Sequence, residues 1–267
     1  MRNRIALGLL VAAAVMGACR PDTVELGYRF EEGREFNYRL TARGKVDYQF
    51  TTTTGGGDYL AVFDVTESIE ATEGAGAIVS VAMTPVKSVE NGLQSPAGEE
   101  LSFRSRIGPN GEVLEVLALN GVPASELSPE QIALIGTMRP KLPLEDETIG
   151  ASWDAGQEFP LPSTFSEVRT TGELEGLEVD ADGRVAEIGF RGGGPLSGTI
   201  AIAGGNAELT GSLDVTGDAV LDVDGGFLRS ASTVNEGDFQ ARLVPENEAP
   251  LTGLIHLELD IDLVLKS

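Results

Sequence analysis

The sequence has almost none of the residues from which disulfides and zinc sites are built. Its 267 residues include one cysteine, Cys19, and one histidine, His256. A single cysteine cannot close an internal disulfide, and a single histidine cannot assemble the usual zinc site. The fold must therefore be held by an apolar core and by backbone hydrogen bonds.

Positive charge is scarce as well. Lys and Arg number 19 and Asp and Glu number 42, which gives a formal net charge of −23. A chain with this balance is repelled by nucleic-acid backbones and by anionic lipid surfaces. The composition therefore argues against a nucleic-acid partner, and any contact with a membrane is expected through apolar groups.

The sequence also lacks the motifs of common enzymes. No Gly-x-Ser-x-Gly elbow occurs, and Gly192-Gly193-Gly194 is predicted to be a loop rather than a phosphate cradle. Residues 180–183 and 222–225 resemble fragments of calcium loops, but the other ligands are absent and β-turns are predicted instead. We therefore expect no enzymatic activity, no metal and no cofactor. His256 is interpreted as a solvated histidine; a hydrolase that uses His256 or surface carboxylates is the alternative.

The one long apolar run lies at the N-terminus. Arg2 and Arg4 precede apolar residues 5–15, and the small residues Gly17 and Ala18 follow them. This order is typical of a secretory signal peptide. The run is too short to span a bilayer as a helix, which takes roughly 20 residues.

Cys19 follows these small residues directly, so that Gly17-Ala18-Cys19 resembles the lipobox of bacterial lipoproteins. The resemblance implies cleavage between Ala18 and Cys19, a covalent lipid on Cys19, and a lipid-anchored place in the bacterial cell envelope. Two or more acyl chains hold a protein durably at a membrane. Arg20 stands where inner-membrane lipoproteins tend to carry Asp, which favours the outer membrane. The alternative is an ordinary signal peptide with an incidental cysteine.

Most of the remaining sequence alternates apolar and polar residues with the period of a β-strand, most clearly at residues 254–265. Hairpin turns are predicted at Asn110-Gly111, Asp182-Gly183 and Asp224-Gly225, and Gly55-Gly56-Gly57 is also predicted as a turn. Separate strands are predicted at residues 184–190, 199–203, 206–215 and 218–223. The pattern predicts an all-β, mainly antiparallel fold with one buried and one solvated face.

One segment carries helical signals instead. Ser128 and Pro129 suit the N-cap and the first helical position. Ile132 and Ile135 share one face, and Pro140 limits the helix to about three turns. We predict one short central helix here.

Two stretches suggest an internal duplication. Residues 30–36 and 153–159 share the order aromatic, acid, x, Gly, x, Glu, Phe. We predict two related β lobes or one long curved sheet; chance similarity is the alternative. The predicted division is a signal peptide (1–18), a tether (19–27), an N-terminal β half (28–122), a linker with the helix (123–150) and a C-terminal β half (151–267).

Together with the lipobox, the opening at residues 28–33 and the stretch at residues 142–153 resemble β-rich bacterial lipoproteins of uncharacterised families. They are also distantly similar in architecture to the half-barrel lipoprotein and lipid carriers of the cell envelope. The resemblance covers most of the chain after Cys19, but its motifs are structural. It implies an apolar ligand inside a curved sheet and transfers no functional residues.

Aromatic residues gather early in the chain, and most are expected in the core. Some are predicted to line an apolar groove between the sheet and the helix, formed by Phe36, Tyr38, Tyr48, Phe50, Ile132 and Ile135. We therefore expect a lipid-anchored, non-enzymatic envelope protein that binds an apolar ligand, such as a lipid, or an envelope protein. A structural or assembly role in the envelope without a small-molecule ligand is the alternative.

Overall fold

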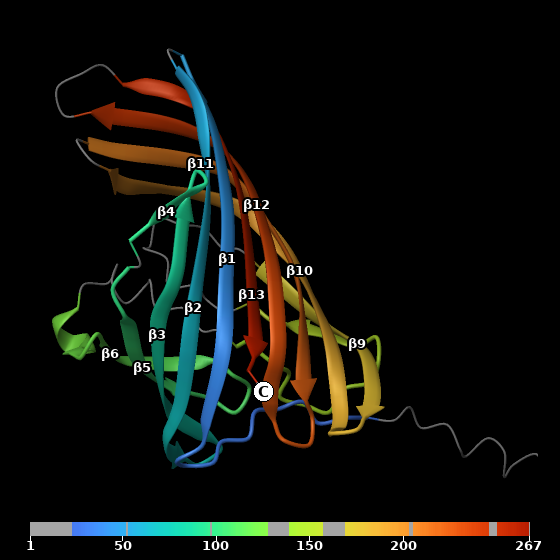
Figure 1. Ribbon diagram of the computed structural model, residues 1–267. Helices are drawn as coiled ribbons and strands as arrows, with labels where there is room; N and C mark the ends of the chain where they lie inside the picture. Colours follow the sequence, from blue (N-terminus) through green and yellow to red (C-terminus); the bar gives the residue numbers. More distant parts are fainter. Residues whose placement is uncertain are drawn as a thin grey trace, which may run out of the picture.

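A computed structural model describes residues 23–51, 53–96, 98–127, 139–156, 169–202, 205–245 and 250–266 (Figure 1). In these residues thirteen strands form one antiparallel sheet, which confirms the all-β prediction in its form of one long curved sheet. Cys19 and the predicted helix at residues 128–138 lie outside the described ranges. Directly before that segment the chain makes only a 3-10 turn, η1 (Ala124–Glu126). None of the helical structure in the described ranges is long and apolar enough to cross a membrane.

The strands differ greatly in length. They are β1 (Glu35–Phe50), β2 (Thr53–Glu73), β3 (Gly76–Glu90), β4 (Leu93–Ser95), β5 (Leu101–Ile107), β6 (Val113–Leu119), β7 (Val122–Pro123), β8 (Ser152–Asp154), β9 (Arg169–Asp180), β10 (Gly183–Ile202), β11 (Gly205–Asp222), β12 (Phe227–Pro245) and β13 (Leu251–Leu265). Their order in the sheet is β7-β6-β5-β3-β2-β1-β13-β12-β11-β10-β9-β8, with β4 beside β3.

The first and last long strands lie at the centre of the sheet. The chain runs outward from β1 to the edge at β7, restarts at the opposite edge with β8, and returns inward to β13. There β13 pairs with β1 from Tyr38 opposite Leu265 to Phe50 opposite Gly253. The two predicted β halves are therefore joined edge to edge by backbone hydrogen bonds.

The three Asn-Gly and Asp-Gly hairpins are confirmed, because they join β5 to β6, β9 to β10 and β11 to β12. The predicted turn at Gly55-Gly56-Gly57 is wrong. These glycines lie inside β2 opposite Tyr48, Asp47 and Val46, and the hairpin reverses between the paired residues Phe50 and Thr53. They are needed because other side chains occupy the space of a Cβ: the Tyr48 ring at Gly55, Asp47 at Gly56, and Asn91 of the turn after β3 at Gly57.

The predicted loop at Gly192-Gly193-Gly194 is wrong for a similar reason. The three glycines lie within β10 and pair with β9 and β11. A Cβ on Gly192 would run into the backbone of Arg169 in β9, so close strand approach explains the glycine. As a result β10 is one strand where two were predicted, and β11 likewise replaces two predicted strands.

The core lies at one end of the sheet. Residues 23–34, which we call the N-terminal segment, and residues 139–151, which we call the connection, cross this end. Val24 pairs with Glu147, and the Tyr28 hydroxyl donates to the Pro140 carbonyl at 3.0 Å. The most deeply buried aliphatic side chains here are Val65, Ile69, Val79, Leu142, Leu174, Ile188, Leu221 and Leu228. We call this region the packed end.

A buried ion pair fastens the connection to the packed end. The side chains of Arg139 and its partner Glu67 in β2 are only 5% and 3% exposed. The Arg139 guanidinium also lies 5.0 Å from the ring centroid of Tyr28 and 5.2 Å from that of Phe30. Burial raises the pKa of the Glu67 carboxyl, and Arg139 opposes this rise. The pair thus joins β2, the N-terminal segment and the connection at one point.

The opposite end of the sheet extends beyond the core. Figure 1 shows β1, β2 and β10 to β13 rising far above β5, β6 and β9, with the upper parts of β11 to β13 bending to one side. We call this region the projecting end. It comprises β1 from Ala42, β2 up to Ala61, β10 from Phe190, β11 up to Gly217, β12 from Thr233 and β13 up to Ile261.

Candidate functional site: an uncharged face of the projecting end

The register of the sheet sorts the side chains of the projecting end by face, because cross-strand partners point to the same side. The face continuous with the buried core, which we call the inner face, carries no charged residue on the described strands of the projecting end. From β2 across to β10 its rows are Ala61, Ala42, Ile261, Thr233, Gly217, Phe190; Tyr59, Gly44, Leu259, Asn235, Val215, Gly192; Gly57, Val46, Leu257, Gly237, Leu213, Gly194; Gly55, Tyr48, Ile255, Phe239, Gly211, Leu196; and Thr53, Phe50, Gly253, Ala241, Leu209, Gly198.

The apolar side chains of this face are partly exposed on β1 and β13, whereas on β10 and β12 the residues Phe190, Leu196, Phe239 and Ala241 are buried. Leu263, at the packed end of β13, is 4% exposed, whereas Leu257, Leu259 and Ile261 on the same face are all partly exposed. Tyr48 reaches 37% exposure. The inner face therefore continues the core outward, and its accessible apolar surface lies mainly on β1 and β13.

Aromatic rings cover several of the glycines on this surface. Tyr59 lies over Gly44, and Tyr48 lies over Gly55, each ring from the strand paired with its glycine. Phe239 lies over Gly211 in the same way. Aromatic rings that cover a cross-strand glycine compensate for its missing side chain. The result is an apolar floor made of rings that reach over neighbouring strands.

Replacing Gly44 with valine tests this arrangement. Valine suits a strand better than glycine does, yet its Cβ would overlap the Tyr59 ring. Because the Tyr59 ring is partly exposed and can turn aside, we expect a loss of about 1 kcal/mol, the low end for overpacking, in the free energy of unfolding measured by denaturant titration. Combining Gly44→Val with Tyr59→Ala should restore part of the loss. Equal stability of Gly44→Val and the parent chain would contradict the packing.

The structure separates the residues predicted to form one groove. Phe36 and Tyr38 are buried at the packed end, 6% and 2% exposed. Tyr48 and Phe50 lie on the inner face of the projecting end with their ring centroids 5.9 Å apart. Tyr38 and Tyr48 are ~33 Å apart along the strand at ~3.3 Å per residue. Ile132 and Ile135 lie outside the described residues.

The outer face of the projecting end is charged. Arg43 is paired with Asp262 at 2.6 Å, and Lys45 with Asp47 at 2.6 Å. These side chains are all about half exposed. Solvated ion pairs of this kind contribute little to stability, about 0–1 kcal/mol each. The two faces therefore differ sharply in the five rows from β2 to β10, with charges on the outer face and none on the inner face; the nearest inner-face charge on a described strand is Glu90 of β3, opposite Tyr59.

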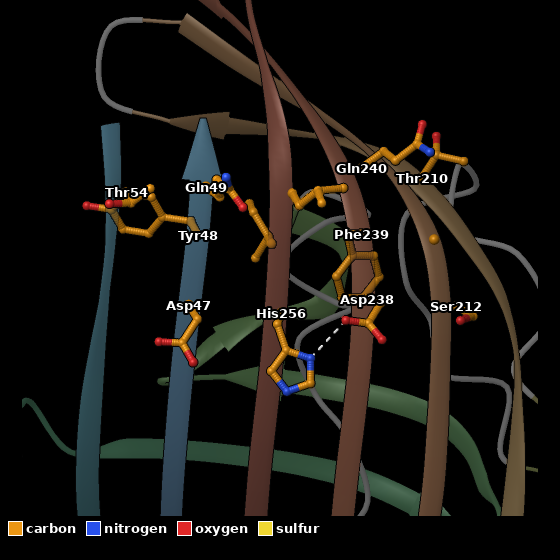
Figure 2. A pocket seen from close by; sticks show the side chains of 13 residues that line it. Asp47, Tyr48, Gln49, Thr54, Thr210, Ser212, Asp238, Phe239, Gln240 and His256 are labelled. Atoms are coloured by element: carbon orange, nitrogen blue, oxygen red, sulfur yellow. Dashed lines mark hydrogen bonds and ion pairs between the residues drawn. The ribbon is translucent and has the colours of Figure 1, made fainter. Parts of the chain in front are cut away.

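His256 belongs to this outer face. Its Nδ1 lies 2.9 Å from Oδ1 of Asp238 (Figure 2). Its Nε2 lies 3.2 Å from Oε1 of Glu258. Hydrogen bonds to these two carboxylates raise the pKa of the imidazole above its ordinary 6.5. Both ring nitrogens already face acceptors, so the ring is not arranged to activate a serine. In the ranges that the structure covers, no group of three or more His, Cys, Asp or Glu residues is placed to hold a metal ion.

The pKa of His256 can be measured directly because the chain has no other histidine. We expect NMR titration to give a value above 6.5, and Asp238→Asn to lower it. The two carboxylates stabilise the folded protein by favouring the charged imidazole. This stabilisation is complete below pH 6.5 and is lost as the pH rises through the raised pKa of His256 in the folded state. An imidazole pKa at or below 6.5 in the folded protein would contradict the two contacts.

No protein-family model matches this chain, and no curated protein matches it. A lipovitellin structure concerned with lipid–protein interactions has a TM-score of 0.47 and 10% sequence identity; the match covers 90% of this chain, which spans 26% of the lipovitellin chain. The Pseudomonas aeruginosa protein OccK11 (OpdR) has a TM-score of 0.27 and 10% sequence identity, and the match covers 91% of this chain and 100% of OccK11. OpdL of the same organism has a TM-score of 0.23 and 8% sequence identity, and the match covers 87% of this chain and 98% of OpdL. Similarities of this size assign neither a family nor a function.

Proposed function

We propose that this protein is a non-enzymatic binding protein, and that its ligand is the acyl part of a lipid held on the inner face of the projecting end. The observation that carries the proposal is the absence of charge from five successive rows of that face, while the outer face of the same strands is charged. A sheet end that only needed solubility would not keep the apolar side chains of β1 and β13 accessible on one face.

The dimensions of the inner face suit an acyl chain. From Ala42 to Phe50 the face extends ~26 Å at ~3.3 Å per residue. An extended chain spans half of a bilayer core of ~30 Å, or ~15 Å. Each buried methylene contributes about 0.8 kcal/mol. Asn235 is the one amide in the five rows, and its nitrogen already donates to the Leu259 carbonyl at 3.1 Å. The face therefore favours apolar contact over head-group recognition.

Titration of the purified full chain with cis-parinaric acid tests this proposal. We expect saturable fluorescence enhancement that oleate reverses, because the probe gains signal when its polyene leaves water. A folded protein that gives no enhancement would refute the acyl ligand. A structural or assembly role in the envelope would then be the better interpretation.

We further propose that the chain is tethered to a bacterial membrane, with the outer membrane favoured, by a lipid on Cys19. The support is the order of residues 1–19: basic, apolar, small, cysteine. Mass spectrometry of the mature N-terminal peptide should show Cys19 as its first residue with the added mass of a diacylglycerol. Cys19→Ser should move the protein from the membrane fraction to the soluble fraction. An unmodified Cys19 in the mature protein would refute the tether.

A further inference from the structure

A groove of about 830 Å³ crosses the outer face of the projecting end, opposite the proposed acyl site. Nine of its thirteen lining residues belong to two outer-face rows. The other four, Tyr48, Ile255, Phe239 and Gly211, form the inner-face row between them. Their side chains point to the inner face, so their backbone forms the floor of the groove. One wall consists of Asp47, His256, Asp238 and Ser212. The other wall consists of Thr54, Gln49, Leu254, Gln240 and Thr210. Figure 2 shows the labelled members of each wall at two levels across the strands.

The two walls offer hydrogen-bonding groups in a regular ladder. Neighbouring strands are ~4.8 Å apart, so the groove crosses five strands over ~19 Å. The amides of Gln49 and Gln240 donate and accept, and the hydroxyls of Thr210 and Ser212 do the same. A chain molecule with hydroxyl groups on every unit can satisfy such a ladder at each step. Leu254, 58% exposed in the middle of one wall, offers contact to the C–H groups of a sugar ring.

The charges in the groove are already paired within the protein. Asp47 lies 2.6 Å from the Lys45 ammonium, and Asp238 lies 2.9 Å from His256. No lysine or arginine is among the lining residues, and the one basic side chain, His256, already faces the carboxylates of Asp238 and Glu258. The groove therefore has no unpaired cation that would attract a phosphate, sulfate or carboxylate. These features favour a neutral ligand over an ionic one.

We propose that this groove binds an uncharged oligosaccharide laid across the strands, in contact with the amides of Gln49 and Gln240 and with Leu254. The site is independent of the acyl-binding face, because its wall side chains point to the other side of the sheet. One protein would thus hold an apolar ligand on one face and a glycan on the other.

The single histidine provides the reporter for this proposal, because it stands in one wall of the groove. The full chain is titrated with chitohexaose, cellohexaose and maltohexaose by calorimetry, and the His256 imidazole signals are followed by NMR. We expect at least one of these probes to bind and to shift the His256 signals. Gln49→Ala with Gln240→Ala should weaken binding about tenfold, and Ser212→Trp should abolish it by filling the groove. Gln94→Ala, an exposed glutamine on β4, is the matched control and should leave the affinity unchanged.

Three results would overturn the proposal. The first is that no neutral hexasaccharide binds to the folded protein. The second is that binding survives in the Ser212→Trp chain or falls equally with Gln94→Ala. The third is that spermine, rather than the oligosaccharides, shifts the His256 signals and is displaced by salt, which would assign the groove to cations. The cis-parinaric acid titration reports on the opposite face of the sheet and is made separately, so its result distinguishes failure here from failure of the acyl-binding proposal.

Discussion

Replacing Leu257 with glutamate should weaken acyl binding by at least about a hundredfold, or about 2.7 kcal/mol. Leu257 is near the middle of the uncharged face, between Val46 of β1 and Gly237 of β12. A carboxylate there must lose its water when an acyl chain covers it, and an unpaired desolvated charge costs several kcal/mol. The measurement is the cis-parinaric acid titration. Binding should recover partly at low pH, where the new carboxyl is protonated and easier to desolvate.

Val234→Glu is the matched control for this experiment. Val234 is an aliphatic residue on the outer face of β12, 41% exposed, and it tests whether added negative charge alone reduces binding. We expect its affinity to stay within about twofold of the parent, a change of less than about 0.5 kcal/mol. If both variants lose binding equally, the acyl chain does not lie on the inner face.

Replacing Arg139 with methionine should lower the free energy of unfolding by about 3–5 kcal/mol, because it leaves Glu67 as an unpaired buried carboxylate. Tyr28 and Phe30 also lose the guanidinium that lies over their rings. The loss is read as a lower midpoint in urea or guanidinium unfolding. A loss below about 1 kcal/mol would show that the pair is solvated and that the connection is not fastened there.

The double variant Glu67→Gln with Arg139→Met separates two effects: the loss of the ion pair itself and the cost of leaving one charge buried without a partner. It should recover much of the stability, because a neutral amide needs no counter-ion. The pH dependence has a definite sign. Burial raises the pKa of Glu67 in the folded state, so the folded protein binds more protons than the unfolded chain above the ordinary value of 4.5. Stability therefore falls as the pH rises through that window, and Arg139→Met should be most deficient at neutral pH and least deficient near pH 4.5. The double variant should lack this slope.

Local sequence signals were sufficient wherever they act within one strand or one turn. The alternation in residues 254–265 predicted β13 with its apolar face, because side chains of a strand alternate between two sides. The Asn-Gly and Asp-Gly pairs predicted three hairpins, because these residues tolerate the backbone of tight turns. Neither inference required knowledge of which strands are neighbours.

The glycine runs were misinterpreted because their meaning depends on a partner strand. Both runs lie within strands, and their neighbours explain why the residues are glycines. The Tyr48 ring occupies the space of a Cβ on Gly55, and the backbone of β9 occupies that space at Gly192. A three-glycine run is typical of a turn when read alone. Only the register, which brings Tyr48 opposite Gly55, shows that these glycines make room for other side chains.

The candidate site shows the same division. By itself the sequence determined an acidic, pleated chain with apolar strand faces, because composition and period two are properties of the chain alone. It could not show that Tyr38 is buried while Tyr48, on the same face of the same strand, is exposed. Only the tertiary structure decided this, because the N-terminal segment and the connection after η1 cover one end of the sheet. It also brought β13 beside β1, which aligns the rows of the uncharged face and those of the polar groove.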